Sequence, residues 1–84
     1  MSGKILLRCK VTAGMFSDEV VVEVRRKEGG SQTFIMESSS VEDVDTEGNG
    51  RIRASVVRRN GTIWAVLPTE YSETIPVDED LVEA

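Results

Sequence analysis

The dipeptide Asn60-Gly61 constrains this chain more than any other feature, because it separates two runs that are rich in β-branched and aromatic residues. Asn and Gly both accept the positive φ angles of a type I′ turn, whose twist matches that of a two-residue β-hairpin. With these two residues as the turn, the pairing over residues 51–68 is fixed. Val57 then faces Trp64, and the neighbouring pairs follow from it.

The predicted hairpin has two unlike faces, because side chains alternate along a strand. An apolar face, expected to belong to the core, carries Ile52, Ala54, Val56, Ile63, Ala65 and Leu67. The opposite face, called the Arg/Trp face below, carries Arg51, Arg53, Ser55, Val57, Arg59, Thr62, Trp64 and Val66. Two interpretations of Trp64 remain open: it packs under another strand or loop, or it forms part of an exposed binding surface.

Alternating apolar residues predict further strands at 4–11, 19–27 and 32–37. The side chains expected to point inward are Ile5, Leu7, Cys9, Val11, Val20, Val22 and Val24. In the third of these strands, Phe34 and Met36 share one face and Thr33 and Ile35 share the other, and the pattern leaves open which face is buried. A short strand at 75–77 contains Pro76, which lacks an amide donor, so this strand should lie at a sheet edge.

Short strands with turns about every ten residues predict an all-β fold in one domain spanning 1–84. The preferred architecture is a small antiparallel barrel of five to six strands, SH3-like, and the alternative is a small β-sandwich. An acidic connection at about 38–50 is expected to be flexible, with Ser40 and Asp43 capping one helical turn. The tail at 78–84 either forms a helical turn or frays, and Met15-Phe16 is expected to plug one end of the barrel.

Composition argues against catalysis. The chain has no histidine, which removes the usual general base and the commonest zinc ligand. Cys9 is the single cysteine, so no intrachain disulfide forms, and its place on an apolar strand face predicts an inert, buried thiol. No motif indicates a cofactor. We therefore interpret the chain as non-enzymatic.

The acidic segment from Asp43 to Gly48 resembles the first half of an EF-hand calcium loop, with carboxylates at Asp43, Asp45 and Glu47. The match fails further on, because Ala54 stands where a bidentate glutamate is required and no flanking helices are predicted. We therefore predict no metal site and keep these three carboxylates as a weak calcium candidate beside a solvated polar loop.

Charge is distributed unevenly along the chain. The formal net charge is −5, yet residues 51–59 contain four arginines and no acid. The leading interpretation is a protein-interaction module that binds a partner through the Arg/Trp face, because Trp and Arg are enriched at binding hot spots. The expected partner-binding residues are Arg51, Arg53, Arg59, Trp64 and Val66.

Two alternatives remain open beside this interpretation. The same face could bind nucleic acid, which the net negative charge disfavours. An assembly subunit could instead pair through an edge strand at 32–37 or 75–77. No apolar run is long enough for a membrane helix or a signal peptide, so a cytoplasmic location without membrane binding is expected. The protein partner and the oligomeric state are left open.

Overall fold

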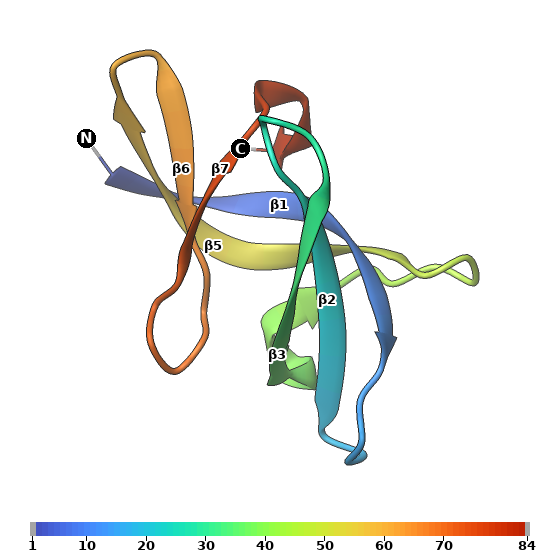
Figure 1. Cartoon of the computed structure of the whole chain (residues 1–84). Coiled ribbons are helices and arrows are strands. Elements are labelled where there is room, and N and C mark those ends of the chain that lie inside the picture. The colour runs from blue at the N-terminus through green and yellow to red at the C-terminus, as the bar shows by residue number, and fades with distance from the viewer. Residues whose placement is uncertain (1, 84) are drawn as a thin grey trace.

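The computed structural model describes residues 2–83 and is nearly all β (Figure 1). Six strands follow one another across an antiparallel sheet in the order β3-β2-β1-β5-β6-β7, and two short strands, β4 and β8, pair with β5 and β1. The strands are β1 (Ser2–Ala13), β2 (Glu19–Arg25), β3 (Ser31–Glu37), β4 (Val41–Glu42), β5 (Asn49–Arg59), β6 (Thr62–Val66), β7 (Thr74–Val77) and β8 (Val82–Glu83), with two 3-10 turns, η1 (Ser38–Ser40) and η2 (Glu79–Leu81).

The sheet curls into a half-barrel, which agrees with the predicted small barrel. The strands at 2–83 all belong to one hydrogen-bonded sheet rather than to two. The curl brings the chain just after β2 to β7, where the Lys27 N–H donates to the carbonyl of Pro76 at 2.9 Å. The SH3-like character of this half-barrel stays a prediction. Within the described residues, no helix is long and apolar enough to cross a membrane.

Strands β1 and β5 form the centre of the sheet and run side by side through the middle of Figure 1. Residues 2–10 of β1 pair with residues 49–57 of β5. The other side of β1 is occupied by β8 and then by β2, while the other side of β5 is occupied by β4 and then by β6. Each central strand therefore pairs with two further strands along the edge that faces away from the other central strand.

The hairpin predicted from Asn60-Gly61 is confirmed. Asn60 and Gly61 have φ angles of 51° and 78°, as a type I′ turn requires. Val57 pairs with Trp64, and the register continues unbroken from Arg59 to Ser55. The turn residues thus set which side chains of β5 and β6 face the core.

The core lies on the inner face of the curled sheet, and the predicted inward residues of the hairpin are all buried. In β1, Leu7 and Val11 are buried while Ile5 and Cys9 are partly buried against the core. The core comprises Leu7, Val11, Val22, Val24, Phe34, Met36, Ile52, Ala54, Val56, Ile63, Ala65, Leu67, Ile75, Val77 and Leu81. The question left open for β3 is settled, because Phe34 and Met36 face inward and Ile35 faces solvent.

Pro76 lies in the last strand of the sheet order, so the predicted edge position is confirmed. The backbone bond from Leu67 N–H to Glu73 O shows that odd-numbered residues of β7 point toward β6. Pro76 therefore turns its nitrogen away from β6, where no donor is required. The proline costs the sheet no ladder hydrogen bond.

Two local predictions are wrong. Ser40 and Asp43 do not cap a turn: η1 ends at Ser40 and has no side-chain cap, because Val41 instead pairs with Ile52 of β5 and packs against the core. Met15 and Phe16 do not plug the barrel, since both side chains are exposed. They lie in the tight turn between β1 and β2, which projects beyond the sheet (Figure 1).

The tail carries a helical turn, η2, whose Leu81 is buried in the core. Strand β8 follows and pairs with Leu6 and Leu7 of β1. The acidic connection ends where Gly50 enters β5, and a Cβ at Gly50 would lie 2.9 Å from a methyl carbon of Val11. Only glycine fits this approach without a shift of its neighbours.

The central position of Ile52 generates a stability prediction. Its side chain is 0% exposed, so Ile52→Ala leaves a cavity and is expected to lower the free energy of unfolding by about 2–5 kcal/mol. Ile35→Ala is the matched control, because Ile35 is 63% exposed and the change should stay within about 0.5 kcal/mol. Urea denaturation of both variants measures the difference. Equal losses would contradict the assignment of the core face.

Candidate functional site

Trp64 lies on the outer face of β6 and is 37% exposed. It lines a half-open hollow of about 300 Å³, called the Trp64 pocket below. The pocket is lined by Val57, Arg59, Trp64, Val66 and Thr74. Three of the five predicted binding residues, Arg59, Trp64 and Val66, are thus brought together, and β7 adds Thr74.

Trp64 is partly packed and partly exposed, and its role as a binding residue stays a prediction. Its two cross-strand partners are Val57 on β5 and Pro76 on β7. Directly opposed residues of a sheet share a face with Cβ atoms about 4.5–5.5 Å apart, and Pro76 is buried although it lies on the outer face. The indole therefore packs against Pro76 while its remaining surface stays open to solvent.

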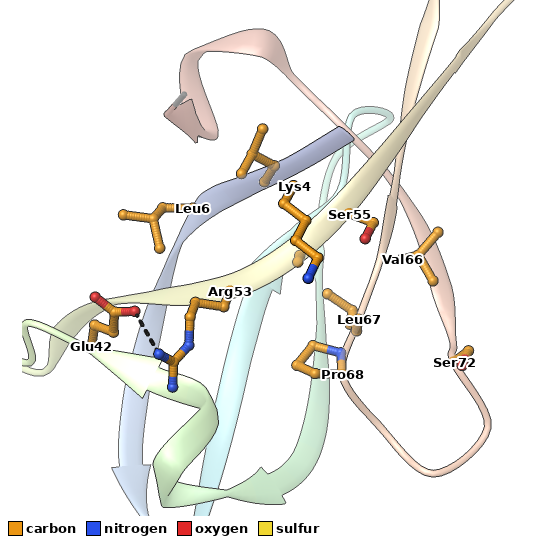
Figure 2. Close-up of a pocket in the computed structure, with 11 residues that line it drawn as sticks. Lys4, Leu6, Glu42, Arg53, Ser55, Val66, Leu67, Pro68 and Ser72 are labelled. Carbon is orange, nitrogen blue, oxygen red and sulfur yellow. Dashed lines mark ion pairs between the residues drawn. The ribbon is translucent and has the colours of Figure 1, made fainter. Parts of the chain in front are cut away.

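Arg53 does not join the Trp64 pocket, because acceptors near β4 hold its guanidinium. It pairs with Glu42 at 3.2 Å and donates to the carbonyl of Ser39. Figure 2 shows the guanidinium turned toward Glu42, away from Val66. The alternation that placed Arg53 on this face is correct, but its side chain is directed to a different neighbour.

A larger groove of about 680 Å³ adjoins the Trp64 pocket and is shown in Figure 2. It lies where β4 ends its pairing at Ile52 and β6 begins its pairing at Ser55, so Arg53 and Ala54 have no strand partner on this side. Lys4 and Leu6 of β1 are among the residues that line it, and Val66 lines both hollows. The groove and the pocket therefore meet at Val66.

Arg51 is held at the opposite end of β5 by the C-terminal strand. Arg8 and Arg51 are cross-strand partners, an arrangement of like charges that destabilises a sheet by itself. Glu83 of β8 resolves this conflict: one carboxylate oxygen lies 2.6 Å from Arg8 Nε, and the other lies 2.8 Å from Arg51 Nε. The hydrogen bonds from Arg8 and Arg51 lower the pKa of Glu83 below its ordinary value of 4.5.

The arginine-rich run at 51–59 is therefore far less basic than its sequence indicates. Of the four arginines at 51–59, Arg51 pairs with Glu83 and Asp43, Arg53 with Glu42, and Arg58 with Glu79. Arg59 has no ion pair within the described part of the chain. The one arginine at the Trp64 pocket is thus the one whose charge is available to a partner.

The acidic loop uses one of its carboxylates for its own backbone. Asp45 Oδ1 accepts hydrogen bonds from the N–H groups of Glu47 and Asn49, both at 2.9 Å, and Oδ2 accepts one from the Asn49 side chain. The hydrogen bonds from Asn49 lower the Asp45 pKa. The structure does not gather Asp43, Asp45 and Glu47 into a group of three metal ligands.

Cys9 is half-buried on the inner side of β1, where it packs against the core. Burial raises the pKa of its thiol from an ordinary value of 9.0 to about 11. A thiol in this state holds its proton at neutral pH and is a poor nucleophile. The geometry agrees with the structural role expected for Cys9.

Three residues that line this surface, Lys4, Leu6 and Thr74, were not predicted from the sequence. Lys4 and Leu6 were placed on the outer side of their strand, but nothing in the sequence showed that this strand pairs with residues 49–57. Thr74 was missed because a four-residue strand after a loop gives no periodic signal. Pairing between distant segments, rather than residue type, brings these residues to the surface around Val66.

Comparisons with protein-family models, with curated protein sequences and with solved structures find no match to this chain. The site is accordingly interpreted from its own geometry.

The bridge made by Glu83 generates a pH prediction. Because the folded pKa of Glu83 is lowered, the stability it contributes is present above about pH 4.5 and is lost as the pH falls through the folded value. Glu83→Gln should therefore lower the thermal midpoint at pH 7 and leave it nearly unchanged in strong acid. Calorimetry over a pH series measures this difference.

Glu79→Gln serves as the control for this prediction. Glu79 is exposed and its pair with Arg58 has a separation of 3.6 Å, so its loss should change little at any pH. A Glu83→Gln variant as stable as the parent at pH 7 would contradict the bridging role.

The raised pKa of Cys9 generates a reactivity prediction. In the folded protein the thiol should react slowly with a disulfide reagent at pH 8 and about tenfold faster per pH unit up to its pKa, because the thiolate is the nucleophile. Stability should fall as the pH rises from 9.0 toward 11, since the unfolded chain loses this proton first. Fast reaction at pH 8 without denaturant would contradict the burial of Cys9.

Proposed function

We propose that this domain is a non-enzymatic protein-interaction module whose docking surface is the Trp64 pocket. The observation that carries the proposal is the combination of a half-exposed Trp64 with Arg59 in one hollow, where Arg59 has no ion pair to any described residue. Trp and Arg are the residues most enriched at hot spots of protein interfaces. The pocket thus offers an apolar contact and a charge at the same point.

The pocket favours a short segment that carries an apolar side chain next to a carboxylate. Val57 and Val66 flank the indole and supply apolar contact area, while Arg59 forms a charged rim. A guanidinium binds a carboxylate through paired hydrogen bonds, which adds direction to the contact. The neighbouring groove, which shares Val66, gives room for the residues that follow in such a segment.

Nucleic-acid binding is the weaker candidate for the same surface. Phosphate binding depends on unpaired Lys and Arg side chains, and affinity scales with the number of phosphates contacted. Carboxylates already neutralise Arg51, Arg53 and Arg58, and the chain has a net charge of −5. A single tryptophan on this face also provides only one stacking platform.

We further propose that the domain has no catalytic activity of its own and acts in the cytoplasm. The chain contains no histidine, and its one thiol holds its proton at neutral pH. A single cysteine in a small domain is typical of a reducing compartment, where disulfides do not stabilise the fold.

Selection of peptides from a random displayed library, with the folded domain as target, tests this proposal. We expect enrichment of peptides with an aromatic or large aliphatic residue near Asp or Glu. Trp64→Ala should weaken the selected peptides by about thirtyfold, a hot-spot loss of about 2 kcal/mol. Arg59→Ala should also weaken binding, whereas Arg58→Ala, a change of a paired arginine that lines neither the pocket nor the groove, should not.

Two results would overturn the proposal. The first is binding that is unchanged in Trp64→Ala while circular dichroism shows the variant folded. The second is tight binding of a single-stranded oligonucleotide by the parent domain, with an affinity that falls steeply as salt rises and is lost in Arg53→Ala. That second result would favour the nucleic-acid alternative.

A further inference from the structure

Strand β3 presents an open backbone edge. The Arg26 N–H donates to Gly30 O at 3.0 Å, and the Ser38 N–H donates to Asp18 O at 2.8 Å, so even-numbered residues between them point toward β2. The N–H and C=O groups of the odd-numbered residues point away from the sheet; these residues are Ser31, Thr33, Ile35 and Glu37. No backbone partner for them occurs among residues 2–83.

The opposite edge of the sheet is closed by contrast. In β7 the outward-facing residues are Thr74 and Pro76, and Pro76 has no N–H. The carbonyl of Pro76 already accepts the N–H of Lys27. Natural sheets protect their edges with proline, lysine or covering chain, and β7 has two of these devices. Strand β3 has neither lysine nor proline, so its edge lacks the protection that β7 has.

We propose that β3 pairs with β3 of a second copy of this chain, antiparallel and about a two-fold axis at Phe34. In this register Thr33 faces the partner's Ile35, and Ser31 faces the partner's Glu37. All four outward-facing residues then exchange backbone hydrogen bonds. A two-fold axis at Thr33 or Ile35 would leave one outward residue unpaired, so the axis at Phe34 satisfies the most groups.

Charge on the outer face supports this register. Glu19 and Glu37 face one another at one end of the β2–β3 hairpin, and neither has an ion pair within the described chain. Arg25 and Ser31 face one another at the other end. Strands lie about 4.8 Å apart, so Arg25 comes within about 10 Å of the partner's Glu37 across the small Ser31. Arg25 pairs with Asp80 of its own chain at 2.8 Å, but both side chains are exposed, and an exposed ion pair contributes little free energy. Each copy thus brings an arginine, bound only by this exposed pair, close to the other's two acids.

This surface is separate from the Trp64 pocket, which lies on β5, β6 and β7. The inference therefore does not rest on the proposed function. The two proposals can fail separately. A protein that binds peptides but stays monomeric would contradict only the dimer, and a dimer that binds no peptide would contradict only the docking function.

Sedimentation velocity over a concentration series tests the pairing. The parent chain of 9.2 kDa should shift toward twice this mass as its concentration rises. Ile35→Pro should abolish the shift, because it removes an outward N–H and no bond to β2. Ile35→Val is the matched control and should dimerise like the parent. A parent that stays monomeric up to about 1 mM would overturn the proposal.

A charge swap tests the register even if Ile35→Pro fails to fold. Arg25→Glu should weaken dimerisation by about tenfold, because it places a third acid beside the partner's pair. Adding Glu37→Arg to that variant should restore the dimer. Arg58→Glu is the matched control, because Arg58 on β5 also pairs with an exposed acid of η2 but lies away from the β3 edge, so this change should have no effect. Dimerisation that is unaffected by both Arg25→Glu and Ile35→Pro would overturn the proposal.

Amide hydrogen exchange gives a residue-level readout. On dilution of the dimer, the N–H groups of Thr33, Ile35 and Glu37 should lose protection, while those of Phe34 and Met36 should keep it through their bonds to β2. Equal protection of both sets at all concentrations would contradict edge pairing.

Discussion

The pairing of β1 with β5 is the constraint on which the rest of this structure depends. On its inner side it sets Leu7 against Ile52, both fully buried, and so begins the core. On its outer side the same register sets Arg8 against Arg51, which repel each other. Glu83 binds both guanidinium groups, so β8 is held where it covers the edge of β1. The same register thus forms the core on one face and places two arginines side by side on the other. Glu83 of the tail compensates the repulsion between them.

The carboxylates that pair with the arginines of β5 come from two segments of the chain. Glu42 and Asp43 come from the segment around β4, and Glu79 and Glu83 come from the tail; together they reach Arg51, Arg53 and Arg58. None of them reaches the Trp64 pocket, where Arg59 lies beside exposed apolar surface. An acidic protein can therefore keep one arginine of this strand available while it neutralises the other three. This division favours recognition of a particular segment over general attraction to polyanions.

The hairpin at Asn60-Gly61 was predictable because a turn with positive φ angles fixes register locally, and alternation then assigns each face. Three parts of the fold carried no comparable signal. Strands β4 and β8 have two residues each, too few for periodicity. The acids that pair with Arg51 and Arg53 are brought near by pairing between distant segments. Met15 and Phe16 are apolar yet exposed, because a tight turn keeps them off the open half-barrel.

The local turn and the distant β1–β5 pairing also imply an order of folding. A hairpin with a two-residue turn forms within about 1–10 μs, since its strands are already adjacent in the chain. Strand β1 must close a loop that contains β2, β3 and β4 before it reaches β5, so this step carries the larger entropic cost. We expect β5–β6 to be the template on which β1 docks late. Until then the apolar side of Ile52 and Val56 faces water, and the speed of that docking limits how long the nascent sheet is exposed to aggregation.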